Sequence, residues 1–222
     1  MAQYISFDGS ATHDVSAVNQ ADFDVAGDLE IITYARLTNW SASSTIMSLR
    51  KSANVFYYGV STDYLRLALD TGTGVEYKNS TVVHGITNDT GQWTRVTRDN
   101  TTGVVKFYKG GDDLDGGPSW VQLGSDVAST AAGLKASGTD PMVVGSAWYS
   151  SWLTGRVYVA KMYDGIGGTL ITDFNATDFT VGDSDTDSAS GSQSNSWVIR
   201  GANAVIAEDS PKGAGLMLLG VG

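Results

Sequence analysis

Cysteine is absent from the 222-residue chain, which excludes disulfide scaffolds, thiolate metal sites and thiol catalysis. Histidine is nearly absent as well: His13 and His84 are too few for a cluster that would hold a transition metal. Positive charge is scarce, because 14 Lys and Arg stand against 24 Asp and Glu for a net charge of −10. Nucleic-acid binding without sequence specificity and polybasic membrane anchoring both need a cationic surface, so neither partner is expected.

The chain also lacks long apolar runs. No stretch approaches the roughly 20 apolar residues of a membrane-spanning helix. Met1–Asp8 has neither the basic nor the apolar region of a signal peptide. We therefore expect a protein that is made in the cytoplasm and does not enter a membrane.

Alternation of apolar and polar side chains recurs along the chain, whereas helical periodicity is nearly absent. Residues 29–37 and 64–70 alternate in this way, as strands do when one face packs on a core. The 27 glycines supply tight turns, for example at Asp70–Gly74 and Asp99–Gly103. The pattern predicts an all-β, antiparallel β-sandwich. Further strands are predicted at 45–50, 55–60, 75–78, 93–98, 104–109, 142–145 and 156–163.

The composition changes toward the C-terminus. The sandwich is predicted over residues 1–181, and residues 182–195 are small, polar and acidic, which is typical of a loop or linker. In the remainder, 196–222, we expect a pair of short strands at Ser196–Arg200 and Ala204–Ala207, followed by an apolar arm.

Three segments resemble successive motifs of the concanavalin A-like, laminin-G-like sandwiches. Residues 20–37 resemble the opening strand pair, and 91–110 resemble the central hairpin, in which a tryptophan starts one strand and an aromatic residue ends the next. Residues 153–164 resemble the late Gly-Arg-aliphatic strand that ends in Tyr-Asp. The resemblance implies a concanavalin A-like jelly roll with a C-terminal extension. Where the family often carries acids after Gly-Arg-aliphatic, this chain has Tyr158–Ala160, so the family's calcium site does not carry over.

Within that family, a chain without cysteine or a signal peptide, and with the tail Trp197–Gly201, resembles bacteriophage virion proteins. The resemblance implies a non-enzymatic structural or decoration protein of the capsid or tail, located in the virion. Such a protein forms homo-oligomers and docks on other virion proteins. The alternative is an adhesin module that binds a host-surface glycan, and the third hypothesis is a polysaccharide-degrading enzyme.

Catalysis is the least expected of the three. Glycosidases of this fold place two carboxylates on an alternating acidic strand. Glu30, Glu76 and Glu208 are the only glutamates, and none lies in such a pattern. His84 and Tyr108 are residue types that serve as the acid–base pair of a polysaccharide lyase. However, the Arg-x-Glu strand that neutralises the substrate carboxylate in such enzymes is missing.

Two acidic segments offer oxygen ligands for Ca²⁺. Asp112, Asp113 and Asp115 form the first, and Asp183–Asp187 form the second. Neither has the glycine and terminal glutamate of the EF-hand pattern. Solvated loops are the simpler interpretation, so no cofactor is expected, and calcium is the alternative.

Aromatic residues supply the candidate ligand site. Trp148, Tyr149 and Trp152 lie close together among serines, a combination that favours stacking on sugar rings or on a protein partner. Trp40 and Trp120 also fall in predicted loops. The alternative is that these rings cap the core, because tryptophan is usually well buried.

A second surface is expected in the C-terminal arm. Leu216, Met217, Leu218 and Leu219 are adjacent large apolar residues flanked by glycines, which disfavour an autonomous helix. A globular sandwich seldom leaves such a cluster in water. We expect the arm to dock on a neighbouring subunit or another virion protein, or else to close the chain's own sheet as a terminal strand.

Overall fold

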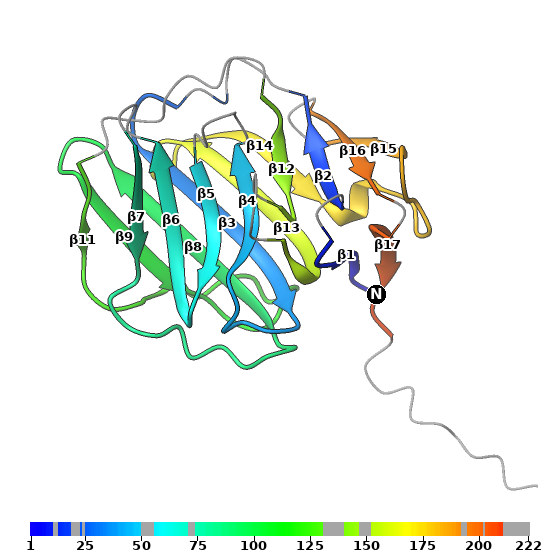
Figure 1. Cartoon of the computed structure of the whole chain (residues 1–222), viewed down its shortest axis with the longest axis horizontal. Coiled ribbons are helices and arrows are strands. Elements are labelled where there is room, and N and C mark those ends of the chain that lie inside the picture. Colours follow the sequence, from blue (N-terminus) through cyan, green and yellow to red (C-terminus); the bar gives the residue numbers. More distant parts are fainter. Residues whose placement is uncertain are drawn as a thin grey trace, which may run out of the picture.

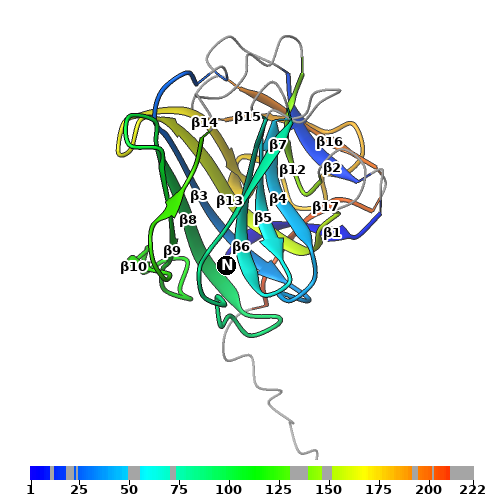
Figure 2. The same ribbon diagram turned by 60° about the vertical axis from the view of Figure 1, so that its left-hand side comes forward.

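Two antiparallel β-sheets pack face to face in the computed structural model of the chain (Figure 1). Turned by 60°, the sheet that contains β3, β8 and β9 lies on one side and the sheet that contains β4 to β7 on the other (Figure 2). The structure describes residues 1–10, 13–18, 23, 25–49, 56–70, 74–130, 140–146, 152–191, 195–201 and 203–210.

One sheet has nine strands among the described residues, in the order β10-β9-β8-β3-β13-β1-β17, with β11 beside β9 and β14 beside β13. Its strands are β1 (Gln3–Asp8), β3 (Leu29–Leu37), β8 (Gly91–Asp99), β9 (Val104–Lys109), β10 (Val121–Gln122), β11 (Val127–Ala128), β13 (Thr154–Asp164), β14 (Thr169–Asn175) and β17 (Val205–Glu208). The second sheet has eight described strands in the order β15-β16-β2-β12-β4-β5-β6-β7. They are β2 (Asp14–Ala17), β4 (Ser44–Leu49), β5 (Phe56–Ser61), β6 (Tyr64–Asp70), β7 (Val75–Asn79), β12 (Met142–Val144), β15 (Ser188–Ser190) and β16 (Ser196–Arg200).

The core fills the space between the two sheets. Ile31 and Leu37 of β3 and Leu65 and Leu67 of β6 all belong to this core, and each is 0% exposed. Because successive side chains of a strand point to opposite faces, the alternation in the sequence decides which residues enter the core. The predicted antiparallel β-sandwich is therefore confirmed.

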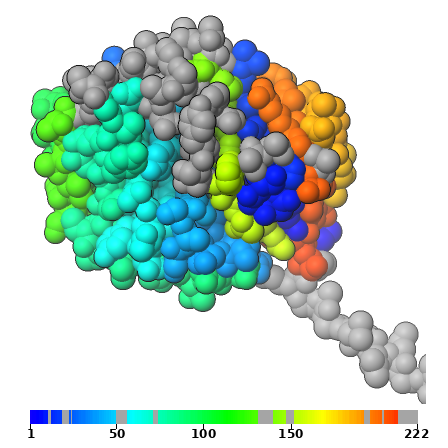
Figure 3. Space-filling model, viewed as in Figure 1, coloured from blue at the N-terminus to red at the C-terminus, as the bar shows by residue number. Residues whose placement is uncertain are grey.

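Strands β4 to β7 form a continuous part of the outer surface (blue to turquoise in Figure 3). The 3-10 turn η2 (Ala176–Asp178) follows β14. In the described ranges, no helix reaches the length and apolarity needed to span a bilayer.

The C-terminal strands depart from the prediction. Ser196–Arg200 and Val205–Glu208 are strands, but they do not pair with each other: β16 pairs with β2 in one sheet and β17 with β1 in the other. Gly201, at φ +91°, lies where the chain passes between the sheets. Residues 182–195 contribute β15 to the same sandwich, so they are more than a linker. The predicted arm that follows, with Leu216, Met217, Leu218 and Leu219, lies outside the described residues.

Trp40 belongs to the core, which corrects its assignment as a candidate ligand-binding residue. Its side chain is 0% exposed, and its indole N–H donates to the carbonyl of Thr90 at 3.1 Å. The ring of His84 packs edge-on against it, with centroids 5.8 Å apart. A tryptophan in a turn can fold back over the end of a sandwich once its N–H has a partner, and the sequence alone does not show that partner.

Both ring nitrogens of His84 are used within the fold. Nδ1 accepts from the backbone N–H of Ile86 at 3.0 Å, and Nε2 lies 2.9 Å from the carbonyl oxygen of Trp40. Because Nδ1 is an acceptor, the proton resides on Nε2, which donates to that carbonyl. A second proton on the ring would remove the acceptor for Ile86.

Burial lowers the pKa of His84 below its ordinary value of 6.5. The unfolded chain then binds a proton at higher pH than the folded chain does. The contribution of neutral His84 to the unfolding free energy is therefore fully present above about pH 6.5. It is lost as the pH falls toward the pKa of His84 in the folded chain. Urea titrations from about pH 8 to about pH 5 should show this loss. His84→Asn should remove its contribution from the pH profile, and His13→Asn should retain it. Equal pH slopes for wild type and His84→Asn would contradict this account.

Candidate ligand-binding face

A second apolar cluster lies on the outer face of the nine-stranded sheet, away from the core. Its centre is a row of four aromatic side chains from four adjacent strands: Tyr4 (β1), Tyr158 (β13), Tyr34 (β3) and Trp93 (β8). Neighbouring ring centroids along this row are 5.5, 5.2 and 5.1 Å apart. These spacings are those of favourable edge-on and tilted aromatic pairs. The row is called the aromatic row below.

A β-bulge in β13 places Tyr158 in the row. Val157 pairs with Ala35 of β3 and Val159 pairs with Tyr34, so Tyr158 is an extra residue in this ladder. As a result Val157 points into the core, whereas Tyr158 and Val159 both join the outer cluster. Strict alternation would have sent one of the two inward.

The loop that follows β9 folds over one end of the row. The hydroxyl of Tyr34 donates to the carbonyl of Asp112 at 2.7 Å, and the indole N–H of Trp93 donates to the carbonyl of Asp113 at 3.0 Å. Gly110 allows this close approach, because a Cβ there would lie 2.7 Å from Cβ of Trp93. Leu114 of this loop packs against the row. The loop thereby holds Asp113 and its neighbours at the edge of the aromatic surface.

Asp209, just after β17, fixes the other end of the row. Its Oδ1 accepts from Nη1 of Arg156 at 2.7 Å, and its Oδ2 accepts from the hydroxyl of Tyr158 at 2.9 Å. Its backbone N–H donates to the carbonyl of Ala2 at 3.0 Å. The guanidinium of Arg156 lies over the ring of Tyr4, 4.3 Å from the centroid. Through its carboxylate and its backbone N–H, Asp209 thus joins the chain after β17 to β13 and to the residue before β1.

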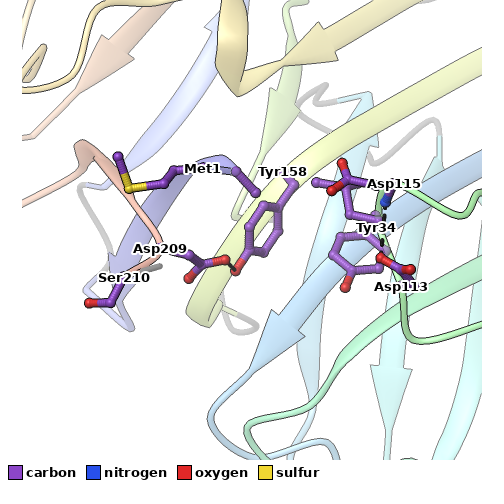
Figure 4. A pocket seen from close by; sticks show the side chains of 9 residues that line it. Met1, Tyr34, Asp113, Asp115, Tyr158, Asp209 and Ser210 are labelled. Carbon is purple, nitrogen blue, oxygen red and sulfur yellow. Dashed lines mark hydrogen bonds between the residues drawn. The ribbon is translucent and has the colours of Figure 1, made fainter. Parts of the chain in front are cut away.

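Two pockets open along this face. The tyrosine pocket, of about 290 Å³, is named for Tyr34 and Tyr158, which are among its lining residues (Figure 4). Its full lining is Met1, Ala2, Tyr34, Asp113, Leu114, Asp115, Tyr158, Asp209 and Ser210. The arginine pocket, of about 340 Å³, is lined by Tyr4, Arg36, Arg156, Glu208, Asp209 and Ser210. Asp209 and Ser210 line both, so the two pockets adjoin.

Electrostatics keep the tyrosine hydroxyls protonated. Burial, together with the nearby carboxylates of Asp112, Asp113 and Asp209, raises the pKa of Tyr34 to about 12. Burial and the hydrogen-bonded carboxylate of Asp209 likewise raise the pKa of Tyr158. At neutral pH both groups are therefore donors and pocket walls rather than bases.

Of the aromatic residues singled out in the sequence, Trp120 lies on this face. It is half-buried against the aromatic row, and the guanidinium of Arg95 lies over its ring, 5.8 Å from the centroid. Trp152 is half-buried just before β13. Trp148 and Tyr149 lie outside the described residues.

The three acidic candidates Asp112, Asp113 and Asp115 are exposed, and the last two line the tyrosine pocket. Over the described part of the chain, no group of three or more His, Cys, Asp and Glu residues is arranged to hold a metal ion.

The sequence did not single out the tyrosines or Asp209, although one signal was present. Tyr34 occupies a position of 29–37 that alternation assigns to solvent, and Tyr158 interrupts the alternation of its strand. Large aromatic residues at outward positions favour a covered or ligand-binding outer face.

No protein-family model matches the sequence, and neither does any curated protein. Solved structures match the fold. A Bacteroides ovatus protein provisionally described as carbohydrate binding aligns with 93% of this chain, at a TM-score of 0.65 and 11% identity; this chain spans 60% of that protein's length. The CBM40 domain of Ruminococcus gnavus IT-sialidase, bound to α2,3-sialyllactose, aligns over 74% of this chain and 91% of its own, at TM-score 0.55 and 10% identity. The LG1–3 region of the laminin α2 chain aligns over 78% of this chain and 32% of its own, at TM-score 0.53 and 14% identity.

The fold is a laminin-G-like, concanavalin A-like β-sandwich. The expectation from the sequence motifs is confirmed at this level. At identities of 10–14%, these similarities show that the fold is shared, and they say nothing about which ligand this chain binds.

The bond between Tyr158 and Asp209 can be tested by removing one oxygen. Tyr158→Phe should lower the unfolding free energy by about 1.5–3 kcal/mol, the usual contribution of a hydrogen bond to a charged group. Tyr77→Phe is the matched control, because Tyr77 is 54% exposed on the other sheet, and it should change stability by less than about 0.5 kcal/mol. Guanidinium titrations measure both. Equal stabilities of Tyr158→Phe and wild type would mean that Asp209 does not fix this end of the row.

Proposed function

We propose that this protein is a non-catalytic carbohydrate-binding module and that the tyrosine pocket is its binding site. The observation that carries the proposal is the juxtaposition in this pocket of tyrosine walls with carboxylates on both sides. Asp113 and Asp115 lie on one side of Tyr34 and Tyr158, and Asp209 lies on the other (Figure 4).

A sugar presents both kinds of group that such a pocket recognises. Its hydroxyls donate hydrogen bonds to carboxylates, and charge-assisted bonds of this type are stronger than neutral ones. Its C–H faces pack on apolar walls, here Leu114 and the edges of the tyrosine rings. Because Tyr34 and Tyr158 are only 6% and 3% exposed, they offer edges rather than open ring faces. The volume of about 290 Å³ is at the small end of ligand sites and suits one or two sugar units.

The comparisons support this proposal at the level of the fold. Two of the structural neighbours are carbohydrate-binding proteins or modules by description. They favour the glycan-binding alternative over the virion role that the sequence motifs implied. The virion location, self-assembly and docking of the C-terminal arm stay predictions, because no structural observation bears on them.

Binding to a glycan array, followed by calorimetry with the best neutral oligosaccharide, tests the proposal. Asp115 is exposed, and its carboxylate lies at the pocket. Asp115→Asn should therefore weaken binding by about tenfold or more while leaving the melting temperature within about 2 °C of wild type. Asp164→Asn, which changes an exposed carboxylate at the far end of β13, should bind as wild type does. Undiminished affinity of Asp115→Asn, or an array without any bound glycan, would overturn the assignment.

A further inference from the structure

Two arginines stand directly opposite each other on the outer face of the nine-stranded sheet. Arg36 of β3 and Arg156 of β13 are paired residues in the strand register, and both line the arginine pocket. Like charges at directly opposed positions repel, so such a pair is unfavourable unless anions offset it.

Only one of the two charges is offset within the described part of the chain. Arg156 binds the carboxylate of Asp209 at 2.7 Å and lies over the ring of Tyr4. Arg36 forms no ion pair with any described carboxylate. Arg36 is half-buried and lines the pocket, and a guanidinium is a planar set of donors that matches a carboxylate or sulfate group.

Two carboxylates, of Asp209 and Glu208, also line the arginine pocket and affect how it would bind an anion. The carboxylate of Asp209 is shared between Arg156 and Tyr158, so it is already paired. Glu208 is exposed on the rim and forms no ion pair among the described residues. Its negative charge opposes an incoming anion, which makes it a useful probe of the sign of the ligand.

We propose that the arginine pocket binds an anionic substituent, a carboxylate or a sulfate, of the ligand, with Arg36 as the principal contact. The inference rests on the proposed function, because the sugar ring itself would occupy the adjoining tyrosine pocket. Asp209 and Ser210 line both pockets, so one ligand can reach from one to the other. The ligand class is therefore an acidic glycan.

Three sugars that share one ring separate the sources of charge: D-glucose, D-glucuronate and D-glucose 6-sulfate. Titrations followed by NMR of the arginine side-chain N–H groups should give a saturable shift at Arg36 with at least one charged sugar. The affinity for that sugar should exceed the affinity for D-glucose by about tenfold, a ratio typical of one charge-assisted contact. Whichever charged sugar binds more tightly identifies a carboxylate or a sulfate as the preferred group.

Neutralising a positive and a negative residue of the same pocket should change the affinity for a charged sugar in opposite directions. Arg36→Gln should abolish the advantage of the charged sugar, and Glu208→Gln should increase it by about twofold or more. Arg200→Gln removes an exposed arginine of β16 in the other sheet and should have no effect. No shift at Arg36 with either charged sugar, or an unchanged advantage in Arg36→Gln, would overturn the inference.

The outcomes also separate this inference from the proposed function. If neutral glycans bind through Asp115 while Arg36→Gln changes nothing, the tyrosine pocket stands and the anion site fails. If a charged sugar shifts Arg36 while Asp115→Asn has no effect on any glycan, the anion site stands and the tyrosine pocket fails.

Discussion

The carboxylate of Asp209 is the contact on which the outer face of the nine-stranded sheet depends. Its two oxygens accept from Arg156 and Tyr158 at 2.7 and 2.9 Å, and its own backbone N–H binds the N-terminal segment at Ala2. One half-buried residue thus joins both ends of the described chain to β13, one of the central strands of the sheet. It also forms the boundary between the tyrosine pocket and the arginine pocket. Without it, the hydroxyl of Tyr158 would lose its hydrogen-bond partner.

The rigidity of this face has a clear physical origin. An outer sheet face is usually polar and solvated, but here the aromatic row is 3–9% exposed, and the loop after β9 folds over one end of it. The hydroxyl of Tyr34 and the indole N–H of Trp93 are both bonded to carbonyls of that loop. A ligand that enters meets walls whose rotamers are already fixed, so it loses little affinity to ordering of the site.

The sequence predicted the parts of the fold that depend on local alternation. The strands at 29–37 and 64–70 agree with β3 and β6, because the apolar side of each strand had to face a core. It did not predict the partner of the last strands. Whether Ser196–Arg200 pairs with its sequence neighbour or joins another sheet depends on long-range packing of Trp197 and Ile206, which are both 1% exposed.

The candidate site was harder to predict for the same reason. Tyr4, Tyr34, Tyr158 and Asp209 are brought together by strand order and by a β-bulge. The bulge leaves only a broken alternation at Tyr158, and the strand order leaves no local pattern in the sequence. In the sequence, Asp113 and Asp115 stood out only as possible oxygen ligands for Ca²⁺ in a loop expected to be solvated, whereas in the structure they line a pocket. Trp40 was noticed because it lies in a turn, yet the turn folds it into the core.

The most direct test of the central claim is an NMR map of backbone amide shifts upon saturation with a glycan selected on an array. If the outer face of the nine-stranded sheet binds the ligand, the largest shifts will gather at Tyr34, Asp115, Tyr158 and Ser210. Shifts that gather on the eight-stranded sheet, or around Trp148–Trp152, with none at those four residues, would contradict the account.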